Sequence, residues 1–383
     1  MRVSKSEKRI QRAAALLCAV VFVVFSFTFL SVYQGSLLEM FYDNVANGRL
    51  QYNSYIVAGI ITALLTLLAS WLNRLAHFKR EWTAFSYLPS AIILAFITDI
   101  DRTIYTGGAS YIGWIIIFVA AILFYAFFAF ILHRVLFAQI KNPEMEGCRI
   151  MWRNLSLMTL LFLLVGMLSS ADEDIKNEAM AYKYYKRGKI DKALKVGRNA
   201  AKASHELTSS RAYYLALKGE LGENLFAYPQ YYGSEGLLPS LNQTTPLLPD
   251  TVYSQFGIER WATENGIEYL TRAVSVDSVP QIVADYYLSA LLLDKRLDEF
   301  VSSLPRYYNV EDANALPKNY KEAILLYNDF AADSTFVVTD EELLKKYTEM
   351  RALEAEYDDI LVRSNMVHSR YGKSYWYYYN YGH

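Results

Sequence analysis

Few residues in this 383-residue chain have the types and spacing that chemistry requires. The clearest pattern is Asp99-Ile-Asp101, which resembles the paired aspartates that hold a metal in some glycosyltransferases. Glu39 is a further carboxylate close to the end of an apolar segment, and charges in such places can mark a functional site. Short patterns arise often by chance, and ordinary solvated loop charges explain these residues better. Asp99, Asp101 and Glu39 are therefore weak catalytic candidates.

The motifs that identify common metals and cofactors are missing from the sequence. The five histidines form no H-E-x-x-H pattern and pair with no cysteine. Gly107-Gly108 lacks the following lysine of a phosphate-binding loop, and there is no Gly-x-Ser-x-Gly elbow. Cys18 and Cys148 are the only cysteines, so no disulfide framework is available. The sequence predicts no cofactor and no metal site.

Tyrosine is the most conspicuous residue after position 170, where 24 of the 32 tyrosines lie, many of them in pairs. One interpretation is packing, because tyrosine fills seams between helices while its hydroxyl finds water or a carbonyl. The other is a binding surface, since tyrosine is enriched where proteins touch partners. Both can hold on a curved helical stack with a concave face. The binding candidates are Tyr184, Tyr185, Tyr213 and Tyr214.

Five apolar runs precede this tyrosine-rich part and predict membrane-spanning helices. A helix needs about 20 apolar residues to cross roughly 30 Å of hydrocarbon. The third run is the doubtful one, because it contains Pro89 and its apolar stretch is short. After a basic leader at 1–12, the expected spans are about 13–33, 55–72, 82–100, 111–132 and 154–170.

Basic residues alternate between the gaps that separate these runs. The leader and the gaps 73–81 and 133–153 are rich in Lys and Arg, whereas 34–54 and 101–110 carry one arginine each. The positive-inside rule then gives five spans, a cytoplasmic N-terminus and an extracytoplasmic segment 171–383. Four spans would send the basic 133–153 gap outward, against the rule. We expect a bacterial inner membrane and a periplasmic second domain.

The two halves of the chain differ in charge. Residues 1–170 hold 14 basic and 8 acidic side chains, and residues 171–383 hold 24 basic and 31 acidic ones. An acidic domain is a poor partner for nucleic acid, whose binding depends on clustered Lys and Arg. The composition therefore excludes a nucleic-acid-binding role and favours a membrane protein with one large soluble domain.

The spacing of small residues predicts helical repeats in 171–383. Ala181, Tyr184, Gly188 and Ala193 fit one tetratricopeptide-like helix–turn–helix unit, and Gly222 follows Gly188 by 34 residues, the length of that repeat. A Pro/Gly-rich loop is expected at 228–250. Thr339 and Glu342 are the pattern of a capping box that opens a long charged helix. The aromatic strip 375–381 is expected to fold back over the last helices.

The whole chain is similar in layout to an uncharacterised family of bacterial membrane proteins with several spans and a helical, tetratricopeptide-repeat-like C-terminal part. Leu217–Gln230 (LKGELGENLFAYPQ), Leu316–Tyr327 (LPKNYKEAILLY) and Ser374–Tyr379 (SYWYYY) carry the resemblance. That resemblance implies an all-α architecture and transfers no catalytic residue, because the family has no established activity.

Two functions of different classes follow from the sequence. The first is a non-enzymatic docking module, in which the periplasmic domain holds a protein or glycan partner near the membrane. The alternative is a membrane-embedded transferase that acts on a lipid-linked substrate of the cell envelope through Glu39, Asp99 or Asp101. The lipid bilayer is a partner in both.

Overall fold

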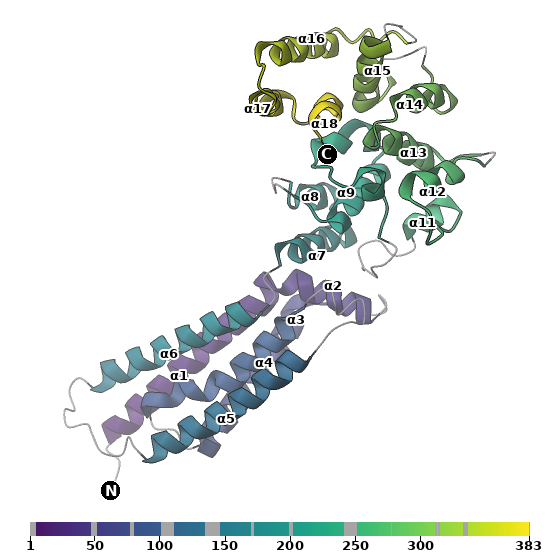
Figure 1. Ribbon diagram of the computed structural model, residues 1–383. Coiled ribbons are helices and arrows are strands. Elements are labelled where there is room, and N and C mark those ends of the chain that lie inside the picture. The colour runs from purple at the N-terminus through teal and green to yellow at the C-terminus, as the bar shows by residue number, and fades with distance from the viewer. Residues whose placement is uncertain are drawn as a thin grey trace. The chain divides into compact units, whose positions relative to one another are not determined.

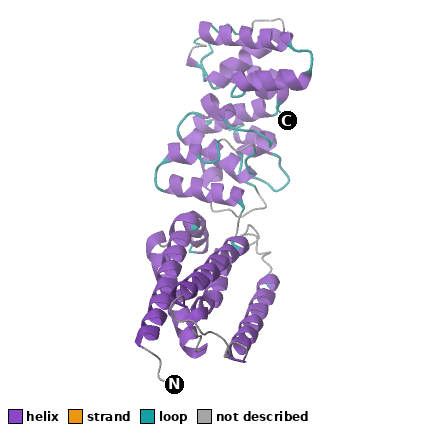
Figure 2. Ribbon diagram, turned by 90° about the vertical axis from the view of Figure 1, so that its left-hand side faces the viewer, coloured by secondary structure: helices purple, strands orange, loops and turns teal. Residues whose placement is uncertain are grey.

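The computed structural model describes residues 5–46, 52–76, 80–100, 111–134, 146–169, 172–198, 202–240, 251–276, 278–310, 312, 315–331 and 336–382 (Figure 1). Every regular element in these ranges is helical, as predicted (Figure 2). The chain divides into two compact units, Met1–Ala179 and Met180–His383.

The first unit is built from long apolar helices. Its elements are α1 (Lys5–Thr28), which continues as the π-helical turn η1 (Phe29–Tyr33), α2 (Gly35–Val45), α3 (Ser54–Ala76), the 3-10 segment η2 (Arg80–Tyr87), α4 (Leu88–Thr98), α5 (Ile112–Arg134) and α6 (Glu146–Leu168). Within it α6 packs against η2, α4 and α1.

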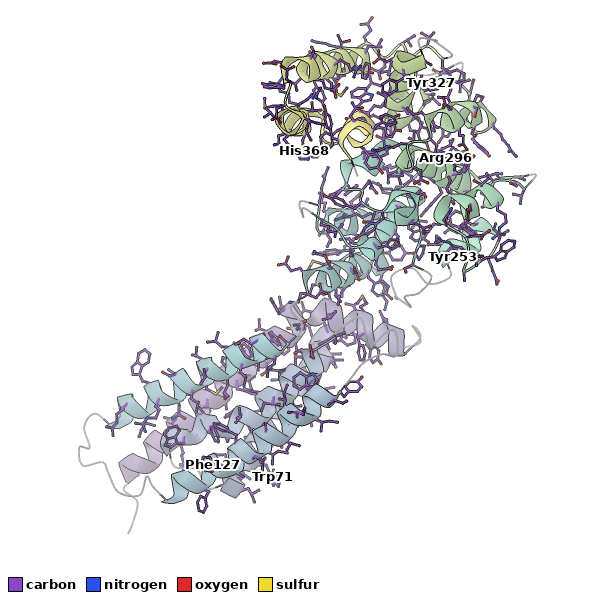
Figure 3. All side chains as sticks on the ribbon, viewed as in Figure 1. Trp71, Phe127, Tyr253, Arg296, Tyr327 and His368 are labelled. Carbon is purple, nitrogen blue, oxygen red and sulfur yellow. The ribbon has the colours of Figure 1, made fainter. Side chains whose placement is uncertain are left out.

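Three helices among the described residues are long and apolar enough to cross a membrane, namely those spanning Arg12–Tyr33, Ser54–Leu75 and Arg149–Leu168. The other two predicted spans form shorter apolar helices, Trp82–Thr98 and Ile112–Phe127, and in the first of these the chain begins as a 3-10 helix before Pro89. Many large apolar side chains point away from the helices: Trp71 on α3 is 59% exposed and Phe127 on α5 is 62% exposed (Figure 3).

Buried polar side chains hold the irregular third run in place. The Asn154 side chain on α6 accepts a hydrogen bond from the backbone amide of Ala84 at 2.8 Å. Ser90 on α4 donates to the carbonyl of Leu65 on α3 at 2.8 Å. These bonds satisfy backbone groups that a tighter 3-10 turn leaves without their helical partners. The stretch 34–54 also differs from the loop expected there, because it contains the 11-residue helix α2.

The second unit is a succession of short helices, and α7 (Glu173–Lys186) contains the boundary between the units. The elements that follow are α8 (Ile190–Lys195), α9 (His205–Leu217), α10 (Leu221–Asn224), η4 (Leu225–Ala227), η5 (Gly233–Leu237), α11 (Thr251–Phe256), α12 (Gly266–Ala273), α13 (Gln281–Leu293), α14 (Leu297–Ser303), η6 (Leu304–Arg306), α15 (Lys318–Ala331), α16 (Glu341–Glu356), α17 (Ile360–Tyr371) and α18 (Tyr375–Tyr381).

One turn recurs at three places in the second unit and joins α7 to α8, α9 to α10 and α13 to α14. Its central residue has a positive φ, of 67° at Gly188, 70° at Gly219 and 58° at Lys295. At each, the next residue donates to the carbonyl five positions back, as Lys189 does to Tyr184 at 2.9 Å. This pattern is the Schellman motif, which ends a helix and reverses the chain.

The structure corrects the repeat spacing. Gly219, and not Gly222, occupies the turn position equivalent to Gly188, so these two turns are 31 residues apart. Gly222 lies inside α10, where an added Cβ would come 2.8 Å from the Tyr320 ring. The glycine is there because of a close approach between helices and not because of a turn.

The long charged helix predicted after Thr339 is shorter than expected and begins one residue later. Asp340 is the N-cap of α16, and its side chain accepts from the Leu343 amide at 3.1 Å. The chain leaves the helical conformation at Tyr357, and Asp359 then caps the separate helix α17. Two aspartate caps therefore divide the predicted helix into two.

Candidate binding grooves beside the C-terminal helix

The C-terminal helix α18 is anchored in the core of the second unit. Tyr375, Trp376 and Tyr378 are buried, and the Trp376 indole donates to the Glu322 carbonyl at 2.8 Å. The Tyr378 hydroxyl donates to the carbonyl of Leu293 at 2.7 Å. The prediction that the aromatic strip folds back over other helices is confirmed. Because α18 is held so closely, the surfaces on either side of it are well defined.

A buried carboxylate completes this anchor. Glu322 on α15 is 1% exposed, and its Oε2 accepts from the backbone amide of Tyr375 at 2.7 Å. Burial raises the pKa of Glu322 to about 7, although Lys318, 3.4 Å away, favours the charged form. The first turn of α18 thus rests on a group that changes charge near neutral pH.

A groove of about 610 Å³, which we call the tyrosine groove, lies on one side of α18. It is bounded by the segment that follows η4 and by the ends of α17 and α18. The residues that line it are Arg198, Phe226, Ala227, Tyr228, Pro229, Gln230, Tyr231, His368, Gly372, Lys373, Ser374, Tyr377, Tyr378, Tyr381 and Gly382. Five tyrosines and three basic side chains line it, without any carboxylate.

The phenols of the tyrosine groove are ordered hydrogen-bonding groups. The Tyr381 hydroxyl donates to Glu354 Oε1 at 2.9 Å, which fixes the ring at the mouth of the groove. Burial raises the pKa of Tyr378 and of Tyr381 to about 12, so both remain protonated at neutral pH. The Arg198 guanidinium lies 5.7 Å from the Tyr228 ring centre, within cation–π range. Such a surface suits a partner with negative charge and flat groups.

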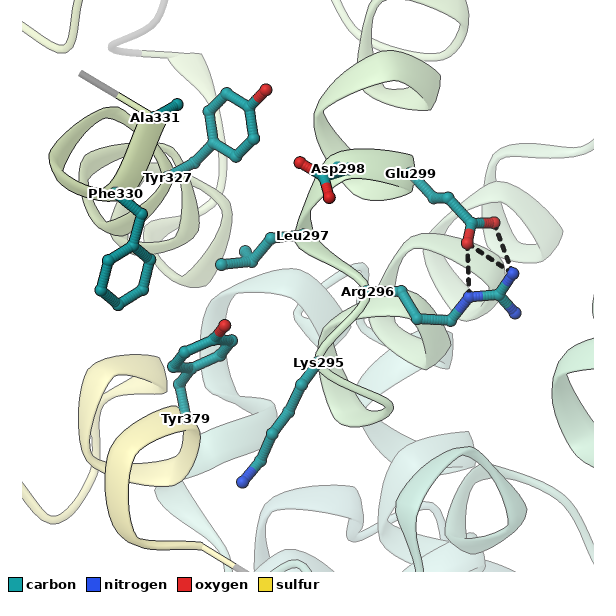
Figure 4. Close-up of a pocket in the computed structure, with 9 residues that line it drawn as sticks. All are labelled: Lys295, Arg296, Leu297, Asp298, Glu299, Tyr327, Phe330, Ala331 and Tyr379. Carbon is teal, nitrogen blue, oxygen red and sulfur yellow. Dashed lines mark hydrogen bonds and ion pairs between the residues drawn. The ribbon is translucent and has the colours of Figure 1, made fainter. Parts of the chain in front are cut away.

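A second pocket of about 590 Å³, the α14 pocket, lies beside the other face of α18 (Figure 4). Lys295, Arg296, Leu297, Asp298, Glu299, Tyr327, Phe330, Ala331 and Tyr379 line it. Its charges are largely neutralised locally, because Arg296 pairs with Glu299 through Nε at 2.7 Å and Nη2 at 2.6 Å. The exposed Phe330 ring faces Tyr379 at 5.7 Å. This pocket carries no net charge bias toward a ligand.

Lys295 connects the two concavities. Its ammonium donates to the carbonyl of Gly382 at 2.9 Å and lies 5.7 Å from the Tyr378 ring centre. Burial lowers the pKa of Lys295. A residue with positive φ therefore both turns the chain and fixes the end of α18.

The tyrosines predicted to bind are part of the packing. Tyr213 and Tyr214 on α9 are 4% and 0% exposed, and half-buried Tyr185 stacks on Tyr214 with ring centres 4.9 Å apart. Tyr184 is also half-buried against the same core. None of the four lines the tyrosine groove. The packing interpretation describes these residues, and the binding surface lies elsewhere.

The carboxylates predicted as weak catalytic candidates are not gathered by the described part of the first unit. Glu39 is buried on α2, and Asp99 at the end of α4 accepts a hydrogen bond from the Trp114 indole at 2.7 Å. Asp101 lies outside the described residues. Across the described ranges, no group of three or more His, Cys, Asp or Glu side chains could hold a metal.

Sequence reasoning missed the basic members of the tyrosine groove, Arg198, His368 and Lys373. They come from segments about 170 residues apart in sequence, so no local spacing joins them. A partial signal existed, because two stretches that carry the family resemblance, Leu217–Gln230 and Ser374–Tyr379, both supply groove residues.

Comparison with known proteins gives one match. The model of a family of unknown function (DUF6057) matches residues 4–279 and 273–382, which is nearly the whole chain. No curated protein and no solved structure matches it.

Proposed function

We propose that this chain, which belongs to the DUF6057 family of unknown function, is an integral membrane protein whose second unit docks an acidic protein segment in the tyrosine groove. The observation that carries the proposal is the composition of that groove. Five tyrosines, Arg198, His368 and Lys373 converge there, in a domain whose overall charge is negative.

The exposed side chains of the first unit support the membrane assignment. Leucine, isoleucine, valine and phenylalanine along α1, α3, α5 and α6 are more than half exposed at positions such as Leu64, Ile116 and Leu163. Water-soluble surfaces rarely carry contiguous apolar patches of this extent. The alternation of basic gaps further supports five spans, a bacterial inner membrane and a periplasmic second unit.

The recurring turn supports a tetratricopeptide-repeat-like second unit. Three helical hairpins close through the same Schellman motif, at Gly188, Gly219 and Lys295. Stacked hairpins of this kind present a continuous surface to a bound chain. The tyrosine groove is the concave part of that surface which offers both aromatic faces and positive charge.

Chemical complementarity favours an acidic protein segment over a glycan. Arginine, lysine and histidine favour carboxylates, and tyrosine contributes contact area at a small loss of side-chain entropy. Groove phenols that stay protonated can donate to carboxylate or backbone oxygens. A neutral glycan would use the rings but would leave the three basic groups without a partner.

Site-specific photocrosslinking of the full chain in intact cells tests the proposal. A photoreactive residue at Tyr231, which is 39% exposed in the groove, should give a discrete adduct. Lys373→Glu in the same chain should remove it, because reversed charge repels an acidic segment. A photoreactive residue at Trp261, 60% exposed and outside the groove, is the matched control. Adducts that Lys373→Glu does not alter, or equal adducts from Trp261, would contradict docking in the groove.

A transferase acting on a lipid-linked substrate is the second candidate. One observation favours it: Glu39 and Asp43, one helical turn apart on α2, are both 4% exposed in a mostly apolar unit. Buried carboxylates near the end of a membrane helix are costly and often functional. If the envelope phenotype is lost with Glu39→Gln, Asp99→Asn or Asp101→Asn at normal protein levels, this candidate gains support. Unchanged cells would remove it.

A further inference from the structure

The first unit contains an elongated apolar groove between α1 and α6, of about 740 Å³, that the docking proposal does not use. We call it the α1–α6 groove. Its lining residues are Val20, Val21, Val24, Phe25, Thr28, Phe29, Val32, Tyr33, Phe162, Gly166, Ser169 and Lys176. All but the last few are apolar, and the polar ones gather at one end.

An aromatic ladder forms one wall of the α1–α6 groove. Phe162 stacks on Phe25 with ring centres 3.8 Å apart, and Phe25 stacks on Phe29 at 5.5 Å. Phe29 stacks in turn on Tyr33 at 5.5 Å. The π-helical turn, closed by the Gln34 amide donating to the Phe29 carbonyl at 2.8 Å, positions the last two rings. Such turns are frequent at functional sites.

A single cation closes the polar end of the groove. The Lys176 ammonium lies 4.4 Å from the Tyr33 ring centre and donates to its hydroxyl at 3.3 Å. An ammonium has three donors, so others remain for a ligand. Tyrosine at the end of an apolar helix marks the level of lipid headgroups.

The length of the groove matches one leaflet of a bilayer. Val20 and Tyr33 are separated by about 20 Å along a helix, at about 1.5 Å per residue. Half of the hydrocarbon core measures about 15 Å, and the headgroup region adds the rest. Gly166 supplies the width, because no heavy atom lies within 4 Å of the place where a Cβ would be.

We propose that the α1–α6 groove holds one acyl chain of a zwitterionic, amine-bearing phospholipid, whose phosphate is bound by Lys176. The acyl chain lies along the ladder, over Gly166. The headgroup amine faces the exposed acidic turn Asp172-Glu173-Asp174, which precedes Lys176 and disfavours a purely anionic lipid. The inference rests on the membrane assignment but not on docking in the tyrosine groove.

Native mass spectrometry of the full chain tests the site. The protein is reconstituted in nanodiscs with equal amounts of phosphatidylethanolamine and phosphatidylglycerol, transferred to mild detergent, and its retained lipid is measured. The wild type should retain phosphatidylethanolamine. Gly166→Phe fills the groove without a backbone clash, and Lys176→Gln removes the charge; each should lower retention by about ten-fold. Gly113→Phe on α5, another open glycine, and Lys192→Gln on α8 are matched controls that should behave as wild type.

Each other outcome overturns a defined part of the inference. No retained lipid in the wild type, or equal retention in all variants, removes the site. Preferential retention of phosphatidylglycerol overturns the headgroup assignment. Loss with Gly166→Phe but not with Lys176→Gln overturns the phosphate contact. Because the measurement needs no protein partner, a failed crosslink at Tyr231 and a failed lipid site are distinguishable.

Discussion

At the scale of single residues, Glu322 shows how a buried acid can couple a chain end to pH. Its carboxylate accepts from the Tyr375 amide, and its own carbonyl accepts from the Trp376 indole. Two residues of α18 therefore depend on one residue of α15. Burial raises the pKa of Glu322 from 4.5 to about 7, which means that the folded state binds a proton more tightly than the unfolded chain does.

We expect the Glu322 contribution to stability to be fully present below about pH 4.5 and to be lost as pH rises through about 7. The loss is on the order of 3 kcal/mol. Denaturant unfolding of the full chain in detergent at pH 5 and pH 8, followed by tryptophan fluorescence, measures it. Glu322→Gln should remove this part of the pH dependence, whereas Glu342→Gln, which is exposed on α16, should keep it. Equal pH slopes for wild type and Glu322→Gln would refute the assignment.

Residue types alone overstated the role of the tyrosine pairs. Tyr213 and Tyr214 are core residues, whereas Tyr228 and Tyr231, which line the groove, stand in a proline-containing segment without helical periodicity. A tyrosine pair is amphipathic in the same way in both settings, so sequence does not separate them. Which ring is covered depends on helices that are distant in the chain.

At the scale of elements, the recurring Schellman turn is the unit from which the second domain is built. Glycine at Gly188 and Gly219 is required by backbone geometry, since both have φ near +70°. Sequence reasoning identified the first hairpin correctly, because Gly188 lies between two short helical patterns. It then chose Gly222 for the second, since the expected period was 34 residues and the observed spacing is 31.

Gly219→Ala should destabilise the second unit by about 1 kcal/mol, because a Cβ disfavours the left-handed conformation. Gly219→Asn should lose less, since asparagine tolerates positive φ better. Gly222→Ala should also destabilise, for a different reason: its Cβ would come 2.8 Å from the Tyr320 ring. Thermal unfolding of the three variants measures these effects. If Asn costs as much as Ala at position 219, a cause other than φ must apply.

Other element boundaries were decided by capping that the sequence offered in two versions. Thr339 and Asp340 are adjacent N-cap candidates, and the structure uses Asp340. Asp359 then opens α17 by accepting from the amides of Leu361 and Val362. Composition favoured a continuous helix because the whole stretch is rich in Glu, Lys and Leu. The end of α16 depends on tertiary packing, which a local pattern does not contain.

At the scale of the whole molecule, the all-helical class and the division into an apolar and a polar part were predictable. Both follow from composition and from the length of the apolar runs, which are properties of contiguous sequence. The grooves were not predictable, because each is formed by segments that are far apart in the chain. In the tyrosine groove, Arg198 and Lys373 meet across α18.

The proposed topology is tested by reporters joined after residues 50, 79, 105, 140 and 170. Five spans predict that these positions lie outside, inside, outside, inside and outside the cytoplasm, following the positive-inside rule. If the run that contains Pro89 did not cross, positions 105 and 170 would be cytoplasmic and 140 external. Paired reporters, one active only in the cytoplasm and one only outside it, distinguish the two cases. A cytoplasmic result after residue 170 would remove the periplasmic role.

The position of Gly382 has a practical consequence for anyone handling this protein. Its carbonyl is bonded to Lys295 and its backbone borders the tyrosine groove. An affinity tag or fluorescent fusion appended after this residue would have to exit beside the groove mouth. It would obstruct any occupant and mimic an inactive mutant, so purification handles belong at the other terminus.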